Sequence, residues 1–575
     1  MRLTFWLPAL LLASAASPGS AQDGANLAGD WEGVLKVNAA VELRLVLHVA
    51  KAEDGAIAAT LESPDQGPGL ARVDSISLTD RSVGFAVKAN GGVFAGKLDE
   101  AGAEIAGEWT QGPSRLPLTL RRGKSAAAPA EVWEGPIQLP NALELRFILR
   151  VIRPEGGPIR ATADSLDQGS NGLKVDSIAI DKASLKFTMK ALKVEYSGTL
   201  DAAGTEARGD FMQNGVKLPL TLRKVAKTTQ ARRPQVPKRP YPYREEQVAY
   251  ANEAAGIKLA GTLTIPEGAG PFPAVLLITG SGPQDRDESL LGHKPFLVLA
   301  DHLTRRGIVV LRVDDRGVGG STGDTMTSTS ADFAGDALAG VAYLKSRKEV
   351  DRGKIGLIGH SEGGIVGPMA AARSGDVAFL VLMAGTGLDG EQILEQQRTL
   401  ILRAVGAKDK DVARQNAAAR KLIAVVKAEP DPVAAAAKLK ALAREAIDAL
   451  PDKGRKALAD AAAADPGLAM LNSPWFRFFL TYDPRPALAK VKCPVLAING
   501  ETDLQVPPRE NLDAIAAALK AGGNSRVTVR ELKGLNHLFQ TSATGSPTEY
   551  GRIEETIAPA ALEAISGWIR EQVGG

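Results

Sequence analysis

The front half of the chain is dominated by a period-two alternation of apolar and polar residues. Between positions 41 and 49 every second side chain is apolar, and Glu42, Arg44 and His48 lie among them. Positions 143–149 show the same alternation. A period of two sends neighbouring side chains to opposite faces of a strand. These segments are therefore predicted to be strands with one buried face.

The same half of the chain is internally repeated. Two segments that begin at Trp31 and Trp133 align at one constant offset without a gap. Such a register is typical of tandem copies of one structural unit. Each copy contains about eight short strands separated by Gly, Asp and Pro turns, which favours a small antiparallel meander closed into a barrel or sandwich. We predict two tandem all-β domains, residues 22–123 and 124–224.

Residues 225–244 separate these domains from the rest of the chain. The segment is rich in Lys, Arg and Pro and contains no acidic residue. This composition predicts an extended linker. A solvated spacer and a segment that contacts an anionic lipid or cell-wall polymer are both compatible with it.

From position 245 onward, strand-like and helix-like stretches alternate. Short apolar runs recur at residues 273–279, 308–313, 355–358, 378–383, 495–498 and 527–529. Helix-like stretches, such as residues 331–348 and 363–372, lie between them. Repeated strand-then-helix units predict a mostly parallel sheet with helices on both faces. The predicted fold class of residues 245–575 is therefore α/β.

Residues 388–475 interrupt this alternation. The stretch is rich in Ala, Lys and Leu and includes helical runs such as residues 433–450. Its position between two predicted strands suits a helical cap over a pocket, which would exclude water and select the substrate. A packed helical insertion is the alternative, and the two are compatible.

Composition limits the classes of protein that fit this pattern. Of the 575 residues, 44% are apolar and 23% are charged, as in ordinary globular proteins, and the length implies several domains. A net charge of +3 gives no sign of nucleic-acid binding. Cys493 is the only cysteine, so no disulfide can form within the chain, and its apolar setting indicates a buried packing residue.

The first 21 residues follow the pattern of a secretory signal peptide. Arg2 precedes an apolar run at residues 3–16, and small residues end at Ala21. The run is too short to span a bilayer and no later stretch is long enough, so stable membrane insertion is not expected. We expect an exported protein, periplasmic or secreted, cleaved near Ala21.

The pattern G-x-S-x-G occurs twice, around Ser321 and around Ser361. A nucleophile elbow needs a strand, a sharp turn and a helix, because this geometry lifts the serine hydroxyl above the sheet. Only Ser361 has a predicted strand before it and a predicted helix after it. Ser321 lies in a loop rich in Gly and Thr. We therefore predict Ser361 as the nucleophile.

A serine hydroxyl needs a histidine to accept its proton and a carboxylate to orient that histidine. Of the five histidines, only His537 follows the serine, as the chain order serine, acid, histidine requires. The acid should follow a strand end, and Asp503 comes soon after the run at residues 495–498. Glu501 is the nearest rival. Asp483 precedes that strand and is interpreted as a turn residue.

The negative charge of a tetrahedral intermediate needs backbone N–H donors that already point at it. The amide of Glu362, directly after the nucleophile, is one candidate. The second should come from the loop after the strand at residues 273–279, where Gly280 and Gly282 let the backbone approach closely. Ser281 is favoured for this role, and Gly282 is the alternative.

Several motifs of the back half together resemble those of bacterial α/β-hydrolases identified as esterases or serine aminopeptidase-like hydrolases. They are TGSGPQDRD at 279–287, DRGVGGS at 315–321, GHSEG at 359–363, GETDLQVP at 500–507 and NHLFQ at 536–540. The resemblance implies a triad of Ser361, Asp503 and His537 and a structural loop at residues 315–317. Many relatives have His-Gly where this chain has Thr279-Gly280. The front repeats resemble a small β domain found beside such hydrolases.

These residues predict a serine hydrolase that acts through an acyl-enzyme intermediate and needs no cofactor. A carboxylic ester of a small molecule is the favoured substrate, because the sequence supplies no acidic pocket for an amino terminus. A serine peptidase or amidase with the same triad, acting on a short peptide, is the alternative. A third hypothesis is a protein that mainly binds through its β repeats. The sequence predicts no nucleic-acid partner and does not set the oligomeric state.

Overall fold

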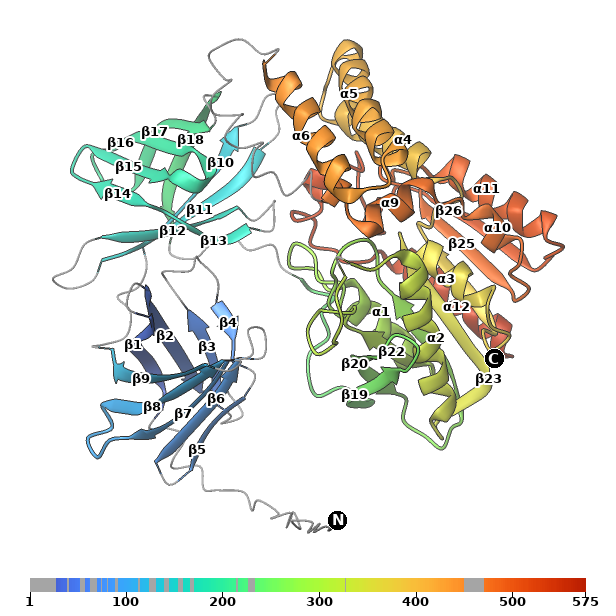
Figure 1. Cartoon of the computed structure of the whole chain (residues 1–575), viewed down its shortest axis with the longest axis horizontal. Coiled ribbons are helices and arrows are strands. Elements are labelled where there is room, and N and C mark those ends of the chain that lie inside the picture. The colour runs from blue at the N-terminus through green and yellow to red at the C-terminus, as the bar shows by residue number, and fades with distance from the viewer. Residues whose placement is uncertain are drawn as a thin grey trace, which may run out of the picture.

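A computed structural model describes residues 27–574, with gaps at 39–40, 52–56, 63–69, 74, 80, 88–91, 112–113, 124–130, 139–143, 154–158, 166–169, 214–215, 226–232, 326 and 449–469. The signal peptide expected at residues 1–21 lies outside the described residues. Figure 1 shows two antiparallel sheets from the front half of the chain and one helix-flanked sheet from the back half.

The first sheet is a nine-stranded antiparallel meander. Its strands are β1 (Gly29–Asn38), β2 (Val41–Lys51), β3 (Ile57–Glu62), β4 (Leu70–Arg72), β5 (Ser75–Thr79), β6 (Ser82–Val87), β7 (Gly92–Leu98), β8 (Glu104–Gln111) and β9 (Ser114–Arg122). β1 pairs with both β2 and β9, so the sheet order is β4-β3-β2-β1-β9-β8-β7-β6-β5. The ends approach each other because β3 contacts β5. The sheet therefore curls into a barrel-like domain.

The second sheet has the same order of strands, β13-β12-β11-β10-β18-β17-β16-β15-β14. Its strands are β10 (Glu131–Gln138), β11 (Glu144–Ile152), β12 (Arg160–Ser165), β13 (Ser170–Lys174), β14 (Ser177–Ile180), β15 (Ser184–Met189), β16 (Val194–Leu200), β17 (Glu206–Gln213) and β18 (Val216–Val225). Trp31 pairs with Leu47 in the first sheet, and Trp133 pairs with Leu149 in the second. Both tryptophans are buried, so each sheet has its own core.

Glycine lets neighbouring strands of each β domain approach closely. A Cβ atom on Gly107 would lie 2.2 Å from the carbonyl oxygen of Ala95, and a Cβ atom on Gly209 would lie 2.1 Å from that of Ser197. No side chain fits at such distances. Both β8 of the first sheet and β17 of the second sheet therefore need glycine at this point.

The back half forms an eight-stranded mixed sheet of order β19-β20-β22-β21-β23-β24-β25-β26. Its strands are β19 (Arg244–Asn252), β20 (Ile257–Ile265), β21 (Phe272–Ile278), β22 (Val309–Val313), β23 (Val350–His360), β24 (Phe379–Met383), β25 (Val495–Gly500) and β26 (Val527–Leu532). The strands from β21 to β26 run parallel, whereas β20 pairs antiparallel with β19 and β22. The predicted parallel sheet is therefore present, with an antiparallel edge in addition.

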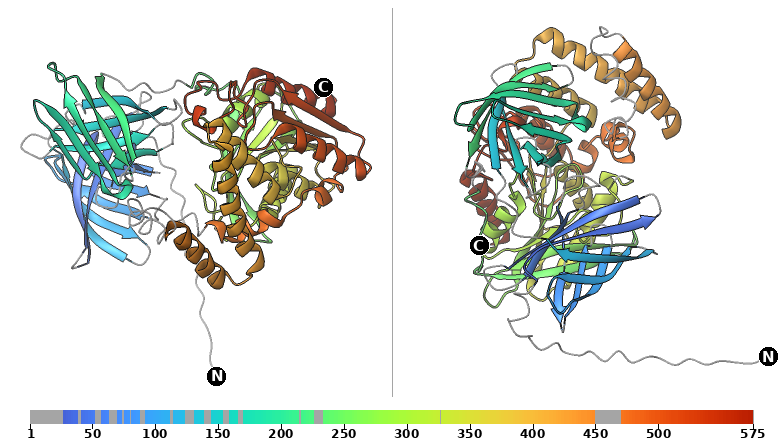
Figure 2. Two further views of the ribbon diagram at one scale, coloured as in Figure 1. Left: turned by 90° about the horizontal axis from the view of Figure 1, so that it is seen from above. Right: turned by 90° about the vertical axis from the view of Figure 1, so that its left-hand side faces the viewer.

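Helices cover both faces of this sheet (Figure 2). The helices that pack on it are α1 (Pro295–Thr304) and α12 (Pro559–Val573) on one face, and α2 (Ser330–Ser346), α3 (Gly363–Ala371) and α11 (Pro508–Ala521) on the other. Leu276 of β21 packs with α2 and α3, and its neighbours Val275 and Leu277 pack with α1. Because both faces are buried, the strands are apolar at consecutive positions.

A helical insertion separates β24 from β25. Its helices are α4 (Gly390–Ala404), α5 (Asp409–Ala428), α6 (Pro432–Asp448) and α9 (Pro474–Thr481), and the short α10 (Arg485–Leu488) follows. The side chains of Asp389 and Ser473 cap the first turns of α4 and α9. The insertion has a small core of its own, which includes Ile423, Val426 and Phe476. Among the described residues, helices that combine the length and apolar character needed to cross a bilayer are absent.

The described part of the linker, residues 233–243, docks on the back half and is not a solvated spacer. Arg233 donates hydrogen bonds of 2.9 Å to three backbone carbonyls, those of Leu291, Gly551 and Ile553. The Gln235 side chain bonds the backbone of residues 556–557. These contacts fix the entry of the chain into the back half.

Candidate active site

Ser361 occupies a sharp turn between β23 and α3. Its φ of +54° lies in the left-handed region, which a residue other than glycine adopts only at local cost. A Cβ atom on Gly359 would lie 2.0 Å from the carbonyl oxygen of Gly363, and one on Gly363 would lie 2.3 Å from that of Ile278. The turn is therefore closed so tightly that only glycine fits on either side of the serine. This is the geometry of a nucleophile elbow.

Ser321, the centre of the second G-x-S-x-G pattern, has its hydroxyl occupied. Its Oγ donates to the carbonyl oxygen of Asp314 at 2.7 Å and accepts from the amide of Ala260 at 2.9 Å. The side chain is buried and ties β20 to the loop after β22. This serine holds a turn together.

His537 and Asp503 come from the loops that follow β26 and β25, and they form a buried pair. Nδ1 of His537 lies 2.8 Å from Oδ2 of Asp503, and the two side chains are 5% and 0% exposed. The other carboxylate oxygen, Oδ1, accepts hydrogen bonds from the amides of Gln505 and Val506. The carboxylate is thus fixed from one side by backbone and from the other by the imidazole.

The two rival carboxylates of the sequence analysis lie elsewhere. Glu501 is exposed, and its Oε2 accepts from the amide of Gly534 at 2.9 Å. Asp483 accepts from the amide of Arg485 and forms an ion pair with its guanidinium. Neither of these carboxylates bonds to His537.

Ser361 and His537 line one cavity of about 270 Å³. Ser281, Glu362 and Gln505 also line it from the sheet side. The opposite wall comes from α4 and α9 and consists of Ile393, Leu394, Gln397, Trp475 and Phe479. The helical insertion therefore covers the cavity, as expected for a cap.

The loop after β21 supplies the backbone beside Ser361. The amide of Gly280 donates to Oε1 of Glu288 at 2.8 Å. Within the described part of the chain, the amides of Ser281 and Glu362 donate to no other residue. Both residues line the large cavity, whereas Gly282 lines only a neighbouring smaller one. The geometry favours Ser281 over Gly282 as an oxyanion donor.

Comparison with known proteins adds an independent line of evidence. Residues 255–531 match the model of the X-Pro dipeptidyl-peptidase (S15) family. Esterase EstD of Thermotoga maritima is 27% identical over 317 residues, which cover 54% of this chain and 65% of the esterase. The match to the family model lies in the back half of the chain, and the chain spans 65% of the length of this curated relative.

Solved structures similar to this chain include an esterase of Pyrococcus furiosus, with a TM-score of 0.36, 15% identity and coverage of 60% of this chain and 98% of the esterase. Hypothetical protein PA2218 from Pseudomonas aeruginosa has a TM-score of 0.37, 17% identity and coverage of 61% and 99%.

The Glu362 side chain links the elbow of the hydrolase to its helical insertion. Oε1 accepts from Ser330 Oγ at 2.6 Å and from the indole Nε1 of Trp475 at 2.7 Å, and the Ser281 side chain is a further partner. Burial raises the pKa of the carboxyl above its ordinary value, although these hydrogen bonds oppose the shift. From the sequence, a role is expected only for the backbone amide of Glu362, and no pattern points to Trp475.

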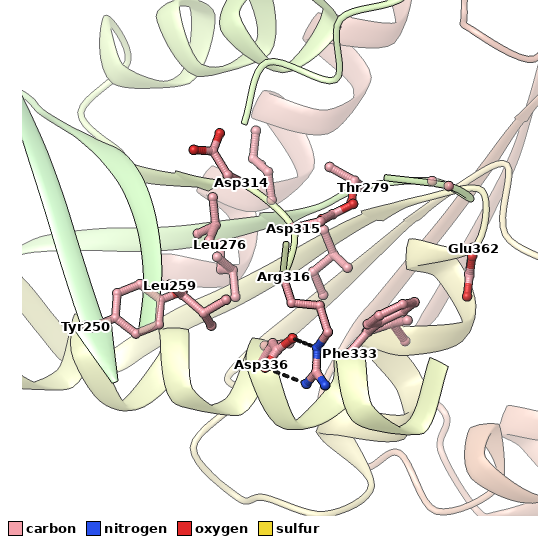
Figure 3. Close-up of a pocket in the computed structure, with 17 residues that line it drawn as sticks. Tyr250, Leu259, Leu276, Thr279, Asp314, Asp315, Arg316, Phe333, Asp336 and Glu362 are labelled. Atoms are coloured by element: carbon pink, nitrogen blue, oxygen red, sulfur yellow. Dashed lines mark hydrogen bonds and ion pairs between the residues drawn. The ribbon is translucent and has the colours of Figure 1, made fainter. Parts of the chain in front are cut away.

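A second acid, Asp315, holds the two ends of the loop after β21 together. It accepts from Thr279 Oγ1 at 2.7 Å and from the amide of Gln284 at 2.9 Å. Burial raises the pKa of Asp315 to about 7, and the nearby carboxylates of Glu362 and Glu288 act in the same direction. It lines a cavity of about 60 Å³. Figure 3 shows this cavity, with the neighbouring residue of the loop, Arg316, paired to an aspartate on α2.

Within the described residues, no group of three or more His, Cys, Asp or Glu side chains is arranged to hold a metal ion.

Proposed function

We propose that the hydrolase cleaves a carboxylic ester of a small substrate through an acyl-enzyme intermediate. The main support is the 2.8 Å pair of His537 with Asp503 in the wall of the cavity that Ser361 also lines. Ser361 Oγ attacks the carbonyl carbon and passes its proton to His537 Nε2, while Asp503 holds Nδ1 and stabilises the imidazolium. His537 then returns the proton to the leaving alcohol, and water releases the acid by the same route.

The oxyanion of each tetrahedral intermediate is bound by the amides of Ser281 and Glu362. Both amides belong to residues that line the cavity together with Ser361. The buried setting strengthens such hydrogen bonds relative to water, because fewer solvent dipoles compete. The helical insertion acts as a cap that excludes solvent during the reaction.

A peptidase or amidase with the same triad is the second candidate, and the match to the S15 family favours it. Two carboxylates, Glu288 and Glu362, line the cavity. Each already accepts two or more hydrogen bonds from the protein, and burial favours the neutral form of Glu362. They are therefore poorly prepared to bind the ammonium group of a peptide, which supports the ester as substrate.

Covalent labelling tests the nucleophile. We expect a fluorophosphonate probe to label the wild-type protein and the Ser321→Ala variant, and to leave the Ser361→Ala variant unlabelled. Mass spectrometry of the labelled peptide identifies the modified residue. Labelling retained in Ser361→Ala, or lost in Ser321→Ala while the protein remains folded, would overturn the assignment. Turnover of short-chain p-nitrophenyl esters and of dipeptidyl amides then separates the two candidate reactions.

Trp475 provides a test of the cavity wall. Its ring stacks on Phe479 at 5.5 Å between centroids, and Trp475→Ala removes this apolar surface together with a hydrogen bond to Glu362. We expect KM for medium-chain esters to rise about tenfold, with a smaller fall in kcat, because the lost contacts bind the acyl chain before the chemical step. Phe478→Ala is the matched control, because Phe478 stacks on Tyr482 of the same region, away from the cavity. Equal KM values for the two variants would contradict this account.

A further inference from the structure

A second histidine–carboxylate pair lies buried beneath the proposed triad. His360 is the last residue of β23, and Glu288 lies in the loop after β21. Nδ1 of His360 is 2.8 Å from Oε1 of Glu288, and both side chains are 7% exposed. The proposed reaction uses neither side chain. Burying a charged pair costs free energy unless hydrogen bonds replace the lost solvation. The hydrogen-bond partners of the pair therefore indicate what it does in the protein.

The pair connects three parts of the proposed site whose relative positions matter for the reaction. Oε1 of Glu288 also accepts from the amide of Gly280, at the start of the oxyanion loop. On the other side, Nε2 of His360 lies 3.1 Å from the backbone carbonyl oxygen of His537. His360 itself is the residue directly before Ser361. One continuous set of hydrogen bonds therefore joins the oxyanion loop, the nucleophile elbow and the loop of the proposed catalytic histidine.

The donors and acceptors of this set define its protonation. A backbone carbonyl oxygen only accepts, so Nε2 of His360 must donate a proton to it. Nδ1 faces a carboxylate oxygen that already accepts from Gly280, so a second proton lies between Nδ1 and Oε1. The pair therefore holds two exchangeable protons and is best described as an imidazolium beside a carboxylate.

The charges that face His360 are consistent with this description. Burial on its own disfavours the imidazolium. The charge and hydrogen bond of Glu288, the carbonyl of His537 and the charge of Asp503 outweigh it and raise the pKa of His360 above its ordinary value. The His537 ring, 5.0 Å away between centroids, and the Phe539 ring complete the surroundings.

We propose that the His360–Glu288 pair, held in its imidazolium–carboxylate form, positions His537 and the oxyanion loop for the reaction. This inference rests on the proposed function. His360 and Glu288 are positioning residues, because they act through the backbone of His537 and Gly280. When His360 loses a proton, its ring keeps one N–H group for two acceptors, the Glu288 carboxylate and the carbonyl oxygen of His537. The remaining proton stays on Nδ1 beside the carboxylate, and the carbonyl of His537 loses its donor. The positioning is therefore present at neutral pH and is lost as the pH rises through the raised pKa of His360.

Glu288→Gln separates the charge of the pair from its geometry. The glutamine oxygen can take the place of Oε1 and accept from both Gly280 and Nδ1 of His360, but it carries no negative charge to stabilise the imidazolium. We expect kcat of the wild type to fall on the alkaline side, and we expect this fall to begin at a lower pH in Glu288→Gln, because the imidazolium is less stable without the neighbouring charge. The measurement is the kcat profile between pH 6 and pH 10 with a p-nitrophenyl ester, corrected for spontaneous hydrolysis.

Glu288→Ala and His360→Phe remove the connection itself. We expect kcat to fall about 10- to 100-fold in each, with KM changed much less, because a small displacement of a reacting group is costly. The inference is overturned if Glu288→Gln keeps the wild-type alkaline limb, or if Glu288→Ala is as active as Glu288→Gln. Should an apolar variant fail to fold, as judged by circular dichroism, the pH profile of Glu288→Gln still decides. Absence of probe on wild-type Ser361 would instead contradict the proposed function.

Discussion

Replacing Asp503 by asparagine is expected to reduce kcat for ester hydrolysis about 10⁴-fold, with little change in the structure. The carboxylate Oδ2 accepts from Nδ1 of His537 at 2.8 Å, which leaves Nε2 unprotonated and ready to accept the proton of Ser361. An asparagine can offer its amino group to Nδ1 instead, and the ring then carries its proton on Nε2. In that tautomer His537 cannot act as a base. Steady-state kinetics with a p-nitrophenyl ester measures the loss.

Glu501→Gln is the matched control for Asp503→Asn. Glu501 lies two residues away on the same turn, carries the same charge, and is exposed. Its Oε2 holds the amide of Gly534, a bond that a glutamine oxygen can also accept. We expect kcat to stay within a factor of about two to three, since surface carboxylates contribute little. A large loss in Glu501→Gln, together with an active Asp503→Asn, would reverse the assignment of the acid.

The positions of Ser361, Asp503 and His537 were predictable because each follows directly from chain order and strand position. In a parallel sheet the loops after successive strands meet at one edge, so residues distant in sequence lie near one another there. Ser321 illustrates the limit of a short pattern. Its five residues match as well as those around Ser361, and only the strand before and the helix after tell the two apart.

Other parts of the site depend on contacts that no local pattern reveals. Trp475 bonds to Glu362 across 113 positions of sequence, and the partner of His360 lies 72 positions before it. Nothing in the sequence around Glu288 indicates that its carboxylate bonds to Gly280 and His360. The short motif around Ser361 predicts the nucleophile and one oxyanion amide, but the partners of the buried side chains of His360 and Glu362 are set by tertiary packing.

The linker shows the same limit on a larger scale. Its Pro-rich, basic composition describes an extended chain correctly, but it does not show what that chain contacts. Oε1 of Gln235 accepts from the amides of Thr556 and Ile557, and its Nε2 donates to the carbonyl of Ile557. The next amide, that of Ala558, donates at 2.7 Å to the carbonyl of Phe539, two residues after His537. The linker is therefore connected to the loop that carries His537.

The double variant Arg233→Ala and Gln235→Ala is expected to destabilise this connection by about 2 kcal/mol or more, because several backbone groups lose their partners. We expect faster thermal inactivation of esterase activity, and faster hydrogen exchange in residues 549–558 and 536–540 than elsewhere in the sheet. Lys238→Ala is the control, since Lys238 is an exposed cation in the same linker.

If the double variant behaves like Lys238→Ala, the linker contacts do not contribute measurably to stability. The α/β domain can then begin near residue 245, as composition suggests. If exchange rises as expected, the functional boundary lies before Arg233, because the segment that follows the β domains is then part of the scaffold behind His537. In that case we expect a truncation at residue 245 to lose activity even though all the proposed site residues remain in the chain. The two outcomes differ in a measurement made on the intact protein, so the boundary is decided without relying on the folding of a fragment.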